Sequence, residues 1–395
     1  MPYAHRPVIF DADTHMMERP GWIAAYADPD VRDRLEPFLK HSVHGMQTVQ
    51  DALVKFDARA QDAAARDAMQ AEFMSMQYKG WHGLGAFDAA ERVCANDLLG
   101  FQAFIVFPTE AFNQVIAATD PHVYLGGVRA LNRGMADFCS IDTRMIGTGY
   151  LPLGMGPEVA LSVLETLIAA DFRALLIDTV APQHARAFTH PDYDGVWARI
   201  QDADLAVTLH IGAQGGEYTA VPGSYFNNGR DNRMHSEGDV PPNALSYMGM
   251  HYSAALFLSA MIFDGVLQRF PKLRIAVVEL GASWIISWMK HIDQSFRAFK
   301  RLQDLSDVKQ LPSEYAQQRI KVTPFAGEDI GWLLNNGAEH MLMFASDYPH
   351  HEGTDDPIGR FERTLVDVSE AQREQFYAGN FRAFMGSRFT ASDTR

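Results

Sequence analysis

Acidic and imidazole side chains follow the first apolar run of the sequence at a spacing that suits metal binding. The run Val8-Ile9-Phe10 is followed by Asp11-Ala12-Asp13-Thr14-His15. Because side chains alternate along a strand, Asp11, Asp13 and His15 would share one face. Burying two carboxylates side by side is costly unless a cation compensates them, and a divalent metal ion supplies that charge. The competing interpretation is a solvated turn whose acids cap a following helix.

Three later apolar runs lead into residues of the same kinds. His210, Glu279 and Asp347 each follow such a run. Taken separately, the histidine is typical of a core residue and an acid is typical of a helix cap. If each residue had only that structural role, all three would have to meet by chance at one end of the fold. Mixed imidazole and carboxylate donors are what zinc, manganese or iron(II) sites use. The sequence therefore predicts these metal ligands: Asp13, His15, His210, Glu279 and Asp347.

Short apolar runs would form the strands that position these residues. Runs of this length are typical of strands buried on both faces of a parallel sheet. Helical patterns lie between them, for example at Pro157–Ala170 and Ser253–Phe270. This alternation predicts an α/β fold, a (β/α)₈ TIM-like barrel of the metal-dependent hydrolase type, with an open doubly wound sheet as the alternative. The predicted strands are Val8–Phe10, Phe104–Phe107, Met145–Tyr150, Ala174–Ile177, Leu205–Leu209, Ile275–Val278, Ile320–Val322 and Met341–Ala345.

Two segments are longer than a minimal barrel requires. Residues 48–100, after the first run, are rich in alanine with interspersed charges and predict a helical insertion. Residues 211–250, after the fifth run, are dense in Gly, Asn and Pro and predict an active-site loop. Both begin at carboxyl ends of strands, where barrel active sites form. Since no Pro/Gly/Ser linker sets the helical insertion apart, we expect residues 1–395 to form a single domain.

The composition limits the classes of partner. Of 395 residues, 47% are hydrophobic and 21% are charged, which excludes disorder for most of the chain. The net charge of −15 disfavours nucleic acid and membrane surfaces. The chain has two cysteines, no signal-peptide layout at its start and no apolar stretch long enough to span a bilayer. These features predict a soluble, cytoplasmic protein.

Several common catalytic motifs are missing. No Gly-x-Gly-x-x-Gly follows a predicted strand, and the sequence has no P-loop, no Gly-x-Ser-x-Gly elbow and no Cys-x-x-Cys. Nucleotide cofactors and serine-triad hydrolysis are therefore disfavoured.

Five stretches, taken in order along the chain, carry a family resemblance. They are Asp11–His15, Phe188–Trp197, His210, Leu267–Arg274 and Ser346–His350. From Asp11 to about Met385, the chain resembles the amidohydrolase-related family. This is the branch of the amidohydrolase superfamily that contains aminocarboxymuconate-semialdehyde decarboxylase and the resorcylate-type decarboxylases.

The resemblance implies a distorted (β/α)₈ barrel, a homodimer and a role for each matching residue. Asp13 and His15 fall on the metal-ligand pair of the first strand, and His210 falls on the ligand of the fifth. Asp347 falls on an aspartate that binds the metal and handles the proton of a water molecule. Asp11 matches an acidic position that supports the ligands from behind.

The carboxylated lysine of the superfamily has no counterpart here, because the fourth predicted strand ends in Asp178. We therefore favour one divalent ion over two. Zn²⁺ is the first choice, with Mn²⁺ or Fe²⁺ as alternatives.

One departure from the family bears on the reaction. Decarboxylases of the family usually carry a histidine followed by glycines at the end of the sixth strand, where this chain has Glu279-Leu280-Gly281. The carboxylate could take a proton from metal-bound water or hold a second ion. His251 is a candidate replacement for the missing imidazole, and His350 is a candidate for supporting the ligands. The catalytic candidates are Asp347, Glu279 and His251.

The main interpretation is a metal-dependent hydrolase in which metal-activated water attacks an ester, thioester, lactone or amide carbonyl. Asp347 would accept the proton of that water and pass it to the leaving group. The first alternative is a nonoxidative decarboxylase of an aromatic or enoic acid, and the second is a noncatalytic ligand-binding barrel. Methionine and aromatic residues near the motifs predict an apolar or aromatic small-molecule substrate. The substrate-binding candidates are Met17, Trp81, Arg230 and Tyr252.

Overall fold

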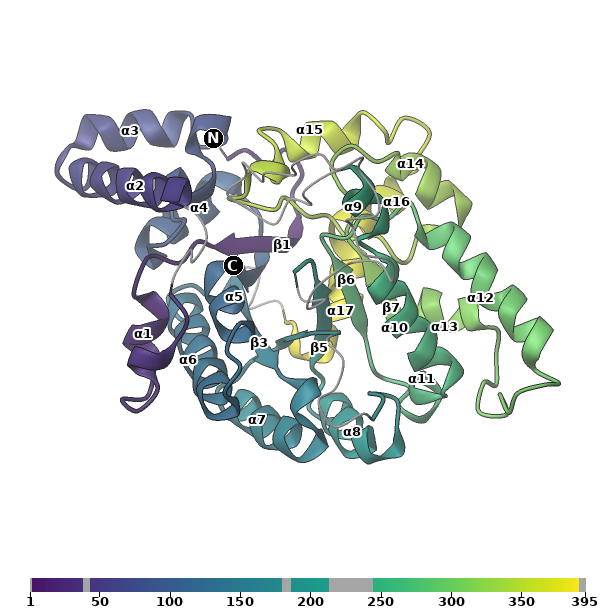
Figure 1. Ribbon diagram of the computed structural model, residues 1–395. Coiled ribbons are helices and arrows are strands. Elements are labelled where there is room, and N and C mark those ends of the chain that lie inside the picture. Colours follow the sequence, from purple (N-terminus) through teal and green to yellow (C-terminus); the bar gives the residue numbers. More distant parts are fainter. Residues whose placement is uncertain (1, 38–42, 180–185, 213–243, 391–395) are drawn as a thin grey trace.

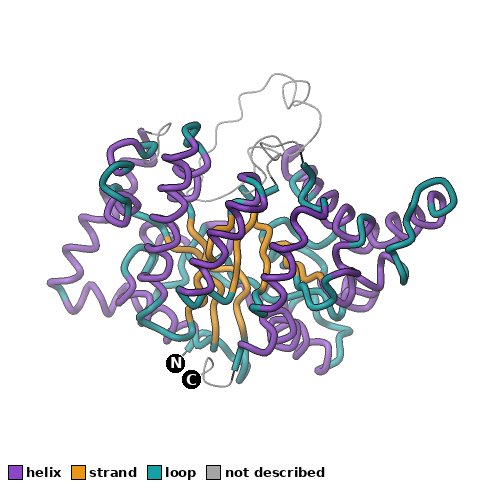
Figure 2. The backbone as a smooth tube through the Cα atoms, turned by 90° about the horizontal axis from the view of Figure 1, so that it is seen from below, coloured by secondary structure: helices purple, strands orange, loops and turns teal. Residues whose placement is uncertain are grey.

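Parallel strands form the centre of the fold. The computed structural model describes residues 2–37, 43–179, 186–212 and 244–390. Within these residues, seven strands form one sheet in the order of the sequence, and every neighbouring pair is parallel. Figure 2 shows the strands enclosed by helices. The strands are β1 (Phe10–Met16), β2 (Ala103–Pro108), β3 (Met145–Leu151), β4 (Ala174–Ile177), β5 (Ala206–His210), β6 (Ile275–Val278) and β7 (Ile320–Val322).

The chain between Met341 and Tyr348 connects the two edges of this sheet. Val322 N donates to Met341 O at 2.8 Å on the β7 side, and His15 N donates to Tyr348 O at 2.7 Å on the β1 side. This segment includes the predicted eighth strand, Met341–Ala345, but it forms only isolated parallel bridges with its neighbours. We therefore find seven regular strands and one extended segment instead of eight strands. Its position between β7 and β1 is consistent with a TIM-type barrel.

Helices follow the strands and cover the sheet (Figure 1), as the alternating pattern predicts. The predicted helix Ser253–Phe270 is two helices, because Gly265 adopts φ +71° between them. The helices are α1 (Trp22–Tyr26), α2 (Val43–Gln61), α3 (Ala63–Ala71), α4 (Ala89–Leu99), α5 (Glu110–Ile116), α6 (Pro121–Cys139), α7 (Pro157–Ala169), α8 (Asp194–Asp202), α9 (Ala244–Gly249), α10 (Tyr252–Phe263), α11 (Val266–Arg269), α12 (Ile285–Phe299), α13 (Pro312–Arg319), α14 (Ile330–Leu333), α15 (Pro357–Glu362), α16 (Glu370–Glu374) and α17 (Asn380–Met385).

The chain between β1 and β2 is largely helical. It contains α2, α3, α4 and two short turns of 3₁₀-helix, η2 (Met76–Tyr78) and η3 (Gly80–His82). In Figure 1, α2 and α3 lie side by side at the edge of the molecule nearest β1. That residues 48–100 are an insertion into a simpler barrel stays a prediction. Most of the predicted loop 211–250 lies outside the described residues, although α9 falls near its end.

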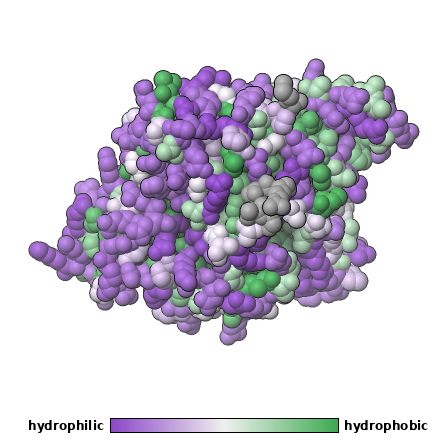
Figure 3. Space-filling view, turned by 180° about the vertical axis from the view of Figure 1, so that it is seen from behind, coloured by the Kyte–Doolittle hydropathy of each residue, from purple (hydrophilic) through white to green (hydrophobic). Residues whose placement is uncertain are grey.

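Apolar burial explains why the strands form where they do. Every residue of β2 and β4 is buried, as expected for strands covered on both faces. The face shown in Figure 3 is mostly hydrophilic, with small separate hydrophobic areas. Within the described part of the chain, no helix combines the length and apolarity needed to cross a bilayer.

Two buried cations contact Tyr348, the last residue of the extended segment. The Lys79 ammonium lies 5.1 Å from the centre of the Tyr348 ring, and the Arg92 guanidinium lies 5.5 Å from it. Arg92 Nε donates to Gly85 O at 2.8 Å, and its Nη2 donates to His15 O. The Tyr348 hydroxyl donates to Leu84 O at 2.8 Å. The helical chain between β1 and β2 therefore braces both β1 and the segment that closes the sheet.

Replacing Arg92 by Met is expected to destabilise the protein by about 3 kcal/mol, because two buried carbonyl groups lose their donor. Urea unfolding of the metal-free protein measures this change. Arg301→Met, at an exposed position, is the control and should leave the unfolding midpoint unchanged. Equal stability of R92M and R301M would show that Arg92 does not brace the closing segment.

Candidate metal centre

The first strand carries two of the predicted ligands within it. The register of β1 against β2 shifts between Asp11 and Thr14, where β1 holds one more residue than β2. Such bulges change the direction of side chains and are common beside active sites. Asp13 and His15 are 1% and 0% exposed. Asp11 is equally buried, and its Oδ1 accepts a hydrogen bond from Ser346 N at 2.9 Å, so it joins β1 to the chain just before Asp347.

His210 is the last residue of β5 and faces the carboxylates of Asp13 and Glu279. Its Nδ1 lies 2.9 Å from Ile211 O. A carbonyl oxygen only accepts hydrogen bonds, so Nδ1 carries a proton, and in the neutral ring Nε2 presents a lone pair. Nε2 lies 3.4 Å from Asp13 Oδ1 and 3.3 Å from Glu279 Oε2. This ring orientation is the one that metal-ligating histidines use.

Glu279 and Asp347 each occupy a turn with a positive φ angle. Both adopt φ +55°, directly after β6 in one case and within the closing segment in the other. Residues other than glycine are strained at positive φ, and such strain is common at functional sites. Glu279 N donates to Thr323 Oγ1 at 2.9 Å, which fixes the first of these turns.

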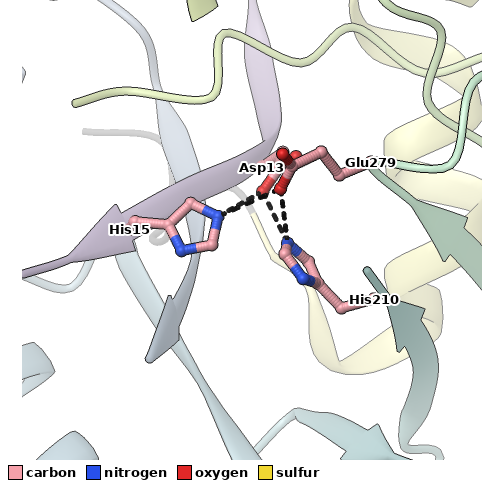
Figure 4. A group of neighbouring side chains, drawn as sticks. All are labelled: Asp13, His15, His210 and Glu279. Atoms are coloured by element: carbon pink, nitrogen blue, oxygen red, sulfur yellow. Dashed lines mark hydrogen bonds and ion pairs between the residues drawn. The ribbon is translucent and has the colours of Figure 1, made fainter. Parts of the chain in front are cut away.

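The predicted ligands converge. Figure 4 shows the carboxylates of Asp13 and Glu279 together, with the rings of His15 and His210 directed at them. His15 Nε2 lies 3.3 Å from Asp13 Oδ1, 3.7 Å from Glu279 Oε2 and 3.6 Å from Asp347 Oδ1. The ligand atoms of Asp13, His15, His210 and Glu279 all lie within 4.8 Å of one another.

His350 extends this cluster. A second group of atoms within 4.8 Å of one another comes from His15, Glu279, Asp347 and His350. His350 Nδ1 lies 3.1 Å from Asp347 Oδ1, and its ring stacks on that of His15 with the ring centres 3.8 Å apart. The two groups share His15 and Glu279, so they form one continuous set of donors.

The charges in this cluster do not balance without a cation. Burial raises the pKa of Asp13, but the neighbouring imidazoles of His15 and His210 outweigh burial and hold that pKa well below its usual range. Burial lowers the pKa of His15 well below 6.5, so its ring is neutral near pH 7. Burial raises the pKa of Asp347 to about 7, helped by the charges of Asp13 and Glu352 and opposed by His350. The neutral ring of His15 therefore faces the carboxyl groups of Asp13 and Asp347.

The residues present fit a divalent metal ion. Among the described side chains, the buried His15 Nε2 and both carboxylate oxygens of Asp347 have no hydrogen-bond partner. A cavity of about 20 Å³ lies against Asp13, Glu279 and Asp347, which is room for one water-sized group. Imidazole nitrogens and carboxylate oxygens suit Mn²⁺, Fe²⁺ or Zn²⁺.

His251 and Tyr252 lie outside this cluster. The half-buried ring of His251 stacks on Trp284 with the ring centres 5.2 Å apart, and burial lowers its pKa to about 4. Tyr252 is 49% exposed and lies against His251. Neither belongs to the two groups of candidate ligands. Their predicted catalytic and substrate-binding roles stay predictions.

The other substrate-binding candidates lie elsewhere. Met17 and Trp81 are buried together in a small apolar cluster beside α2, where the Trp81 indole donates to Glu18 O at 2.9 Å. Their side chains pack in this cluster, and a role in binding substrate stays a prediction. Arg230 lies outside the described residues.

The sequence analysis assigned no role to three residues near the ligands. Glu352 lines the same small cavity as Asp347, and among the described residues its two buried oxygens have no hydrogen-bond partner. Lys79 is 0% exposed, and burial lowers its pKa to about 8, although the charge of Asp347 opposes this shift. Thr109 directly follows β2 and contacts the candidate ligand His15. Thr109 meets the strand-end criterion that identified the candidate ligands, whereas no pattern in the sequence marks Lys79.

A comparison with known protein families matches residues 10–386, nearly the whole chain, to the family described as amidohydrolase. The chain belongs to the amidohydrolase family. This confirms the family resemblance drawn from the motifs. A curated relative, the 2-amino-3-carboxymuconate-6-semialdehyde decarboxylase of Dictyostelium discoideum, is 27% identical over 140 residues. That match covers 35% of this chain and only 38% of the relative's length.

Solved structures of other amidohydrolases show the same fold. An amidohydrolase from Mycobacterium avium subsp. paratuberculosis matches with a TM-score of 0.72 and 17% identity, over 97% of this chain and 100% of that one. The 5-carboxyvanillate decarboxylase of Novosphingobium aromaticivorans, solved with manganese and 4-hydroxy-3-methoxy-5-nitrobenzoic acid, matches with a TM-score of 0.62 and 16% identity, over 96% of each chain. The curated relative and the Novosphingobium protein are both named as decarboxylases.

Proposed function

We propose that this amidohydrolase catalyses the nonoxidative, metal-dependent decarboxylation of an aromatic or enoic acid. The observation that carries the proposal is the convergence of Asp13, His15, His210 and Asp347, with Glu279, in a chain that is similar to two proteins named as decarboxylases. Mn²⁺ now replaces Zn²⁺ as the ion we favour, because the donor set is rich in carboxylates and a related structure holds manganese. The predicted homodimer and cytoplasmic location stay predictions.

Decarboxylation breaks the bond between a carboxylate and its neighbouring carbon. The electron pair left on that carbon must receive a proton, and CO₂ leaves. A divalent ion held by Asp13, His15, His210 and Asp347 would neutralise the negative charge of the substrate. Glu279 stands at the end of β6, where decarboxylases of the family carry a histidine, and we assign it the delivery of the proton to carbon. Burial of the centre excludes water that would compete for this proton.

Glu279 also favours a second candidate function. The Glu279 carboxylate, whose Oε2 lies 3.3 Å from His210 Nε2, could act as a general base that takes a proton from attacking water. The second candidate is therefore a metal-dependent hydrolase of an ester, thioester, lactone or amide. A noncatalytic barrel that only binds a ligand is the third.

Product analysis of the manganese-loaded protein separates these candidates. The panel contains hydroxylated benzoic acids, enoic acids, and aromatic lactones and thioesters. We expect CO₂ release from at least one acid, with a proton in place of the lost carboxylate in the product. Hydrolysis without CO₂ release would overturn the proposal in favour of the second candidate. Ligand binding with neither reaction would favour the third.

Replacing Glu279 by Gln is expected to lower the rate of CO₂ release by about 10²- to 10³-fold, because the amide cannot donate the proton. Manganese content should stay near that of the wild type, since the other ligands remain. Glu279→His is the matched variant and should retain more activity than E279Q. An E279Q protein that releases CO₂ at the wild-type rate would exclude Glu279 as the proton donor.

A further inference from the structure

The hydroxyl group of Thr109 lies between two imidazole rings of the metal centre. Thr109 is 4% exposed and stands at the carboxyl end of β2. Its Oγ1 lies 3.3 Å from His15 Nδ1 and 3.2 Å from His350 Nε2. The same oxygen lies 2.9 Å from Met16 O and 3.8 Å from Met17 Sδ.

The chemistry of these neighbours determines where the protons lie. A hydroxyl group has one proton to donate and accepts up to two hydrogen bonds. The carbonyl of Met16 only accepts, so the shortest of these contacts takes the Thr109 proton. Toward the two rings the oxygen then acts as acceptor. His15 must carry its proton on Nδ1, and His350 must carry its proton on Nε2.

In the neutral form of each ring, this arrangement directs a lone pair at a carboxylate. His15 Nε2 faces Asp13 Oδ1 at 3.3 Å, and His350 Nδ1 faces Asp347 Oδ1 at 3.1 Å. A lone pair and a carboxylate oxygen repel each other at such distances unless a cation lies nearby. The hydrogen bonds of Thr109 therefore preorganise both rings as donors to a cation.

The backbone around Thr109 is fixed independently of the histidines. Glu18 is 1% exposed, and its two carboxylate oxygens accept from Thr109 N at 3.0 Å and Glu110 N at 2.8 Å. These contacts lie at the start of α5, where a carboxylate is favoured by the free N–H groups. The position of the hydroxyl is thus set by β2 and α5, so it orients the rings instead of following them.

We infer that Thr109 is a positioning residue that sets the tautomer of His15 and His350, and that this makes His350 a donor to the metal centre together with Asp347. The inference rests on the metal centre of the proposed function but on neither reaction. His350 then acts in the ligand cluster itself, not only as a support behind it.

Three variants test the inference. Thr109→Val keeps the shape of the side chain and removes the hydroxyl group, whereas Thr109→Ser keeps the hydroxyl group. Thr148→Val is the control, because Thr148 is equally buried on β3 and its hydroxyl donates to Val106 O at 3.0 Å, away from any imidazole. Mn²⁺ affinity is measured by competition with a chelator.

We expect T109V to bind Mn²⁺ about 10- to 100-fold more weakly than the wild type, which is the usual cost of losing a group that orients a ligand. T109S and T148V should stay within about threefold, well inside the range of such effects. A wild-type affinity in T109V would overturn the inference. If T109V fails to fold, T109S and the measurement described next still decide the question.

Nitrogen-15 NMR of the metal-free protein reads the tautomers directly, with the two rings assigned from His15→Gln and His350→Gln variants. The wild type and T109S should show His15 protonated on Nδ1 and His350 protonated on Nε2, whereas T109V should show mixed tautomers. The opposite tautomer at either ring in the wild type would overturn the inference. Because this readout needs neither metal nor substrate, its failure is distinct from failure of the proposed function.

Discussion

Replacing His210 by Ala is expected to weaken manganese binding by at least about 10²-fold and to bring turnover below detection. Losing a group that merely supports a ligand already costs 10- to 100-fold in metal affinity or activity, and losing a ligand should cost more. His210 Nε2 lies 3.4 Å from Asp13 Oδ1 and 3.3 Å from Glu279 Oε2, so its removal takes away one of the two imidazoles that contact both carboxylates. Equilibrium dialysis against Mn²⁺, followed by metal analysis, gives the affinity.

His291→Ala is the matched control for this measurement. His291 is exposed on α12 and lies outside the ligand cluster, so this variant should bind manganese as the wild type does. A second readout is thermal unfolding with and without Mn²⁺, because a metal that binds only the folded state raises its stability. Equal stabilisation of H210A and the wild type by Mn²⁺ would mean that His210 is not a ligand.

Replacing Asp347 by Asn is expected to lower turnover by about 10³-fold even at saturating manganese. The amide has the size of the carboxylic acid and one coordinating oxygen, but it neither carries the negative charge nor exchanges a proton. Asp347 Oδ1 lies 3.6 Å from His15 Nε2 and 3.1 Å from His350 Nδ1, so the substitution changes the group that faces both rings. Metal affinity should fall about 10- to 100-fold, which excess Mn²⁺ restores.

The decisive comparison is turnover at saturating metal. Asp355→Asn, a few residues along the chain at an exposed position, is the control and should keep wild-type turnover. If added Mn²⁺ restored full activity to D347N, the carboxylate would act only by binding metal, and no charge or proton of Asp347 would be needed in the reaction.

Most of the candidate ligands could be predicted because each is a polar residue that follows an apolar run. His210 follows four buried residues of β5, and Glu279 follows β6, so an apolar run closing in a polar residue was a sufficient signal for both. The pattern placed β1 too early, at Val8–Phe10, whereas the strand is Phe10–Met16. Asp13 and His15 are polar residues that are nevertheless buried within this strand, so in the sequence the strand seemed to end before them.

Contacts that depend on packing between distant segments were not predictable. Lys79 reaches the Tyr348 ring only because the chain between β1 and β2 folds against the closing segment. The left-handed backbone conformation of Asp347 was not predictable either, because no neighbouring glycine marks it in the sequence. Glu279 was the residue that placed hydrolysis before decarboxylation, and we propose the reverse order because the chain is similar to proteins named as decarboxylases.

Counting metal in the protein tests the central claim most directly. Protein dialysed against Mn²⁺ and then freed of unbound ion should hold one ion per chain. A chelator should remove the ion and the activity together, and Mn²⁺ should restore both. Protein that retains no divalent ion under these conditions, or that works equally well after the ion is stripped, would contradict the claim that these acids and imidazoles form a metal centre.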